Sequence, residues 1–90
     1  MELEKSVLVR LKMFGGKPAD SEVLAYIVKK SLQSAMDFCS VHEFPDEAET
    51  YLVDWIVSDY LTETDGYSKQ WERIRKDAEI GLINFRRMRW

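Results

Sequence analysis

Cysteine and histidine each occur once in this 90-residue chain, and long apolar runs are missing. The single cysteine, Cys39, excludes an internal disulfide and a cysteine-based metal cluster. The single histidine, His42, leaves little for a zinc site or for histidine-dependent catalysis. No run approaches the roughly 20 apolar residues that span a bilayer, and the N-terminal stretch lacks the apolar core of a signal peptide. We therefore expect one domain that stays in the cytoplasm.

Charged residues are abundant, at 32% of the chain, and they are distributed unevenly. Residues 1–36 hold six Lys/Arg and four Asp/Glu, residues 37–65 hold nine Asp/Glu and no Lys/Arg, and residues 66–90 hold seven Lys/Arg and three Asp/Glu. A small protein with an acidic middle and basic ends can associate head to tail with copies of itself. The alternative is that these charges lie on ordinary solvated helix faces.

Apolar spacing predicts an all-α fold, a small bundle of about four helices with a basic-aromatic C-terminal arm. Leu3, Val7, Leu11 and Phe14 recur at the helical period over residues 2–13. The pattern continues over residues 21–39, 46–64 and about 69–80, with Asp20 or Ser21 and then Ser68 as candidate N-caps. We expect residues 1–80 to form the bundle and residues 81–90 to form the arm.

The arm combines bulky apolar residues with arginines, a composition that disfavours free exposure to water. Either the arm folds back on its own bundle or it docks elsewhere. We expect it to dock on a protein partner through six residues: Phe85, Arg86, Arg87, Met88, Arg89 and Trp90. Binding of this basic segment to a membrane surface is the less favoured alternative, because the segment is short.

Enzymatic chemistry is not expected, and neither a cofactor nor a metal ion is predicted. Cys39 and His42 lie three residues apart, but Cys39 falls on the apolar stripe of the second helix, which favours a core cysteine. Gly15 and Gly16 lack the Lys-Ser/Thr of a phosphate-binding loop. Sequence-specific DNA binding is disfavoured because the pI is near 5.1 and the third helix is acidic.

Two stretches carry a resemblance to a known family. Residues 37–46 (DFCSVHEFPD) lead into a helix with Ala48, Tyr51, Leu52, Asp54 and Trp55, and the chain closes with FRRMRW. This pattern resembles the small head–tail connector proteins of long-tailed phages, also called adaptor or head-completion proteins. The resemblance covers about residues 4–62 and 80–90. Members of that group often carry a longer loop between the third and fourth helices, where this chain has only residues 64–68.

The resemblance implies a structural virion protein at the head–tail interface. Copies of the chain would form a ring, commonly twelvefold, beneath the portal, with a stopper or tail-completion protein on its far side. DNA would pass through the channel without sequence-specific binding, and no membrane would be involved. The arm would reach the portal, and Glu47 and Asp54, seven residues apart, would face the channel and repel DNA phosphates. The rival interpretation is a small helical interaction or regulatory module with no phage role.

Overall fold

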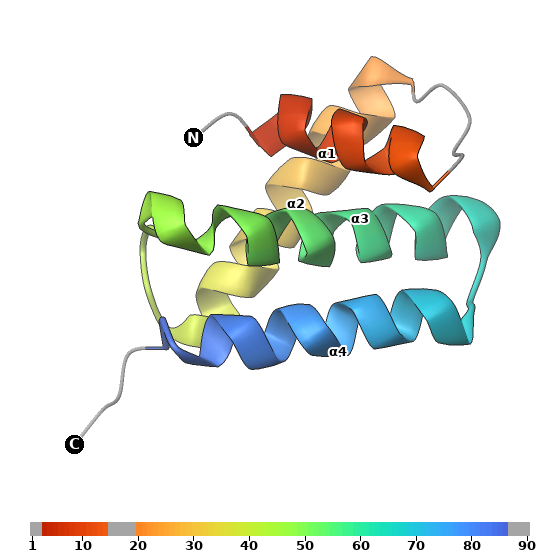
Figure 1. Ribbon diagram of the computed structural model, residues 1–90. Helices are drawn as coiled ribbons and strands as arrows, with labels where there is room; N and C mark the ends of the chain where they lie inside the picture. The colour runs from red at the N-terminus through yellow and green to blue at the C-terminus, as the bar shows by residue number, and fades with distance from the viewer. Residues whose placement is uncertain (1–2, 15–19, 87–90) are drawn as a thin grey trace.

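The computed structural model describes residues 3–14 and 20–86, and these residues confirm the all-α prediction. Four α-helices pack into a compact bundle, and the described residues contain no strand (Figure 1). The predicted spans of the first two helices agree with the structure over the described residues. The third α-helix begins at residue 49, three residues later than predicted, and ends at residue 65, one residue later. The elements are α1 (Leu3–Met13), α2 (Ser21–Cys39), the short 3-10 helix η1 (Asp46–Ala48), α3 (Glu49–Asp65) and α4 (Lys69–Ile83).

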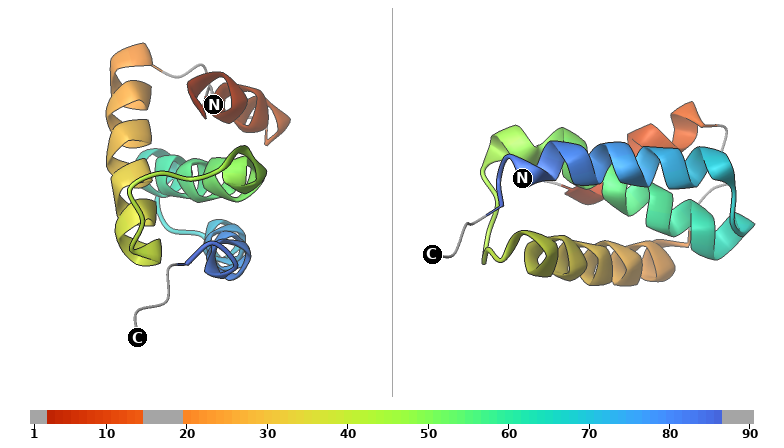
Figure 2. Two further views of the ribbon diagram at one scale, coloured as in Figure 1. Left: turned by 90° about the vertical axis from the view of Figure 1, so that its left-hand side faces the viewer. Right: turned by 90° about the horizontal axis from the view of Figure 1, so that it is seen from below.

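Helix α3 lies at the centre of the bundle. It packs between α1 and α4, while α2 crosses the side of the bundle (Figures 1 and 2). A helix that is apolar on most of its circumference has to be buried, and α3 has this character. Its buried residues are Leu52, Val53, Trp55, Ile56, Val57, Ser58, Tyr60 and Leu61.

Side chains cap the helices where the sequence predicts. The Asp20 carboxylate accepts the Glu22 amide N–H at 2.9 Å at the start of α2, and the Ser68 hydroxyl accepts that of Gln70 at 3.2 Å at the start of α4. Each bond satisfies a donor that the first helical turn leaves free. At its other end, α2 stops at Ser40, which adopts a left-handed conformation with φ of 56°.

Helix α4 runs three residues beyond the predicted end at Ile80, so the bundle does not stop at residue 80. Gly81 and Leu82 are buried within the helix. Gly81 lies against the Tyr51 ring of α3, and an added Cβ would overlap that ring. The expectation that Gly81 begins the arm is therefore wrong, because this glycine allows α3 and α4 to approach closely.

Candidate interaction surfaces

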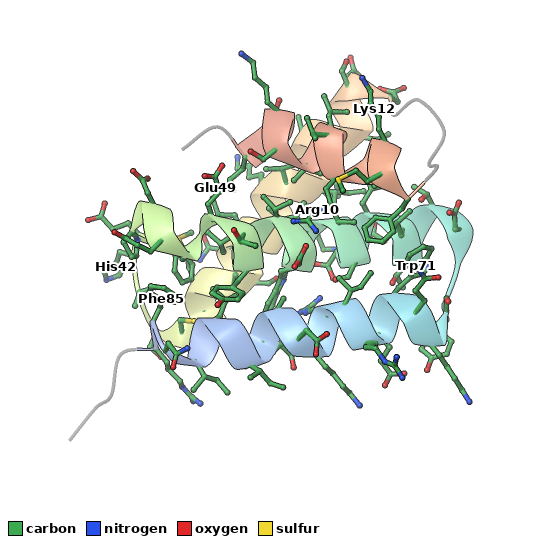
Figure 3. The ribbon with its side chains drawn as sticks, viewed as in Figure 1. Arg10, Lys12, His42, Glu49, Trp71 and Phe85 are labelled. Atoms are coloured by element: carbon green, nitrogen blue, oxygen red, sulfur yellow. The ribbon has the colours of Figure 1, made fainter. Side chains whose placement is uncertain are left out.

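The base of the arm is held against the bundle by two aromatic contacts. Phe85 is half-buried, and its ring centroid lies 6.4 Å from that of Tyr51 on α3 (Figure 3). The guanidinium of Arg86 lies 5.8 Å from the Phe38 ring centroid on α2. The structure thus describes the first two of the six residues predicted to dock on a partner. Arg87, Met88, Arg89 and Trp90 lie outside the described residues.

Cys39 is a core residue, as its place on the apolar stripe predicts. Its thiol is fully buried and donates to the Leu82 carbonyl oxygen at 3.4 Å. Burial raises the pKa of this thiol, and the nearby charge of Arg86 opposes that rise only in part. A thiol held in its neutral form is a poor nucleophile. His42 is exposed, and no cluster of three potential metal ligands occurs within residues 3–14 and 20–86.

The two acidic residues predicted to face a channel have different surroundings. Glu47 is exposed and belongs to η1, before α3 begins. Asp54 lies on α3, with its side chain 24% exposed and its Oδ1 atom 3.5 Å from Nη1 of Arg10 on α1. Burial raises the pKa of the Asp54 carboxyl, Arg10 lowers it, and the charge of Asp77 adds to the rise.

An open groove runs along the surface where α1 packs on α3, and it was not predicted from the sequence. Its volume is about 360 Å³. Val9 and Met13 are 61% and 73% exposed, and the Ser6 hydroxyl donates to Oε1 of Glu49 at 2.9 Å across the groove. The available signal was that Val9 and Met13 are apolar residues outside the Leu3, Val7 and Leu11 stripe. The groove residues are Ser6, Val9, Arg10, Met13, Glu49, Thr50 and Val53.

A polar cluster joins α2, α3 and α4. Asp59 accepts a hydrogen bond from the Ser31 hydroxyl at 2.7 Å and pairs with the guanidinium of Arg75. That guanidinium lies 3.6 Å from the centroid of the buried Trp55 ring, and it also pairs with Glu79 at 3.4 Å. Charge pairing and stacking together hold the three helices in register.

No helix in the described part of the chain is long and apolar enough to cross a membrane. Comparisons with protein-family models, with curated proteins and with solved structures give no match for this chain.

Proposed function

We propose that this chain is the protomer of a phage head–tail connector ring and that its basic-aromatic arm docks on the portal protein. The observation that carries the proposal is the fixed base of the arm. Phe85 and Arg86 pack on Tyr51 and Phe38, so residues 87–90 start from a defined point at one end of the bundle. A docking segment with an ordered base loses less conformational entropy when it binds.

The composition of the arm suits a protein partner. Arginine and tryptophan contribute more binding energy at protein interfaces than most other residues do. The arm contains Arg86, Arg87, Arg89 and Trp90, with Met88 among them. Its guanidinium groups would pair with carboxylates on the portal, while the indole and thioether fill apolar pockets.

Ring formation fits the arrangement of the helices. Helices α1 and α4 lie on opposite sides of α3, so the molecule has two different faces for contacts with two neighbours (Figure 1). Contacts between unlike faces generate a ring when the rotation between copies closes. Both of these helices carry a small excess of basic residues, so attraction between copies would have to come from the acidic segment 37–65 of one copy and basic residues of the next.

Glu47 is the stronger of the two candidates for the channel wall. Its side chain is exposed, whereas Asp54 is half-buried and faces Arg10. An exposed carboxylate repels DNA phosphates and keeps the duplex from adhering to the wall.

The proposal is tested by size-exclusion chromatography with light scattering, first on the chain alone and then with a purified phage portal protein. We expect a ring, or a large complex that forms only with the portal. A compact monomer that does not bind the portal protein would contradict the assignment as a connector protein. It would favour the alternative of a small helical interaction module.

A triple variant, Arg86→Ala with Arg87→Ala and Trp90→Ala, tests the arm. It should abolish portal binding and leave the circular dichroism spectrum unchanged. The matched control, Lys69→Ala with Arg73→Ala and Tyr67→Ala, also removes two positive charges and one aromatic ring from exposed positions. Equal loss of binding in both triple variants would refute the assignment of the arm.

A further inference from the structure

We infer that the groove between α1 and α3 binds residues 87–90 of a second copy of this chain. The inference rests on the proposed function, in which copies associate head to tail, and it names the contact that joins them. The portal and the groove would then compete for the same arm.

The groove has an apolar floor and a charged edge. Val9 and Met13 from α1 and Val53 from α3 supply the apolar surface. Glu49 stands at the edge, where it accepts a hydrogen bond from Ser6 and retains further acceptor capacity (Figure 3). Arg10 also lines the groove, but its guanidinium lies 3.5 Å from the Asp54 carboxylate, so Glu49 is the lining residue that offers a negative charge to a partner.

The sequence of residues 87–90 has the complementary pattern. Basic and apolar residues alternate in the order Arg87, Met88, Arg89, Trp90. When a chain binds in an extended conformation, successive side chains point to opposite sides. Met88 and Trp90 would then contact the floor of the groove, and one of the two arginines would pair with the Glu49 carboxylate at its edge.

Chain length favours a second copy over the same molecule. Residues 87–90 span at most about 14 Å when extended. Packed helices lie about 8–10 Å apart, and α3 separates α4 from α1 (Figure 2). An arm that starts at Arg86 would spend most of its length crossing α3 before Met88 and Trp90 reached the groove.

A contact of four residues is small, so each contact alone should be weak. Stable protein interfaces usually bury about 1,200–2,000 Å², which four side chains do not supply. Closure of a ring raises the effective concentration of each arm at its groove. Free copies should therefore associate weakly and reversibly. A closed ring should be more stable than an open chain of copies as long as its arms occupy the grooves and not the portal.

Disulfide trapping tests the contact on the full-length chain. One copy carries Met13→Cys in the groove, and the other carries Met88→Cys in the arm. The two are mixed under mild oxidation, and the native Cys39 is buried and should not compete. We expect a disulfide-linked heterodimer at a yield at least about tenfold above the control pair, because docking raises the local thiol concentration.

The control pair replaces Met13→Cys with Ile80→Cys. Ile80 is a similarly exposed apolar residue, at 65%, but it lies on α4, away from the groove. Equal cross-linking of the two pairs would overturn the inference. A chain carrying both Met13→Cys and Met88→Cys that forms only an intrachain disulfide would also overturn it, since the arm would then occupy its own groove.

A second measurement separates the inference from the proposed function. The double variant Val9→Arg with Met13→Arg should abolish self-association in sedimentation velocity and keep portal binding. The triple variant Arg86→Ala, Arg87→Ala, Trp90→Ala should lose both self-association and portal binding. If the groove variant lost portal binding but still self-associated, the groove would be a binding site for the portal protein. That result would overturn the inference. Specific cross-linking without any portal binding would support the groove contact and refute the connector.

Discussion

At the scale of single residues, Gly81 is the position where packing overrides helix propensity. Glycine lowers the stability of a helix interior by roughly 1 kcal/mol relative to alanine. In this molecule the glycine lies inside α4, where any side chain would overlap the Tyr51 ring. The close approach of the two helices at this point outweighs the propensity cost.

Gly81→Ala should therefore destabilise the protein by about 1–3 kcal/mol, the usual range for overpacking. Urea unfolding followed by circular dichroism measures the change. Ile80→Ala, at the exposed neighbouring position, serves as the control and should change stability by at most about 0.5 kcal/mol. A more stable Gly81→Ala protein would show that propensity dominates and that the Tyr51 ring can move.

Asp54 provides a second prediction at this scale. Burial raises the pKa of its carboxyl above the ordinary 3.8, so the folded state binds the proton more tightly than the unfolded state does. Relative to an Asp54→Asn variant, the wild-type chain should gain stability as pH falls through the raised pKa and lose it as pH rises. Urea unfolding of both proteins between about pH 7 and pH 4 measures this difference. Titration of the Asp54 carboxyl by NMR at or below 3.8 would contradict the prediction.

At the scale of elements, the cluster around Asp59 determines how α2 and α4 sit on α3. Ser31 comes from α2, Asp59 and Trp55 from α3, and Arg75 from α4. Apolar contacts bring the helices together but tolerate sliding, since the hydrophobic effect has no preferred direction. The directional bonds to Asp59 select one arrangement.

Arg75→Leu should destabilise the fold by about 1–3 kcal/mol, because Asp59 would lose its counter-charge in a half-buried position. Lys76→Leu is a matched control on the next residue. It removes the more exposed Lys76–Glu72 ion pair, which should contribute at most about 0.5 kcal/mol. Urea denaturation compares the two. Equal effects would show that the Asp59 cluster does not hold the helices together.

At the scale of the whole molecule, the proposed function predicts that the charge separation governs how copies meet one another and how they meet DNA. The acidic segment 37–65 includes the exposed stretch that leads into α3, and the basic residues Arg86, Arg87 and Arg89 follow α4 in the sequence. Attraction between unlike ends of different copies weakens as salt screens it. Self-association should therefore decrease with ionic strength.

Charge reversal tests the proposed channel wall. Glu47→Lys should leave thermal unfolding unchanged, because the side chain is exposed, and should impair DNA ejection from assembled particles. Asp54→Lys should instead lower the melting temperature, because it places a cation beside Arg10. Normal ejection with Glu47→Lys, or failure of ring assembly, would remove Glu47 from the channel wall.

The amino-acid sequence by itself predicted the helical class, the span of α2 and the core position of Cys39. These features depend on local periodicity and capping, which neighbouring residues determine. The resemblance to connector proteins and the role of the arm stay predictions. The composition of the arm indicates a binding segment through Arg86, Arg87, Arg89 and Trp90. The identity of the partner depends on the partner's own surface.

Tertiary structure alone decided the central place of α3, the close packing at Gly81, the Asp59–Arg75 pair and the groove beside Val9. Each of these joins residues that are far apart in the chain, as with Ser6 and Glu49, 43 residues apart. The end of α4 was misjudged because a glycine after Ile80 resembles a helix stop when its neighbours in space are unknown. Local sequence sets which helices form, whereas close packing between distant segments sets which surfaces are buried and which are left for partners.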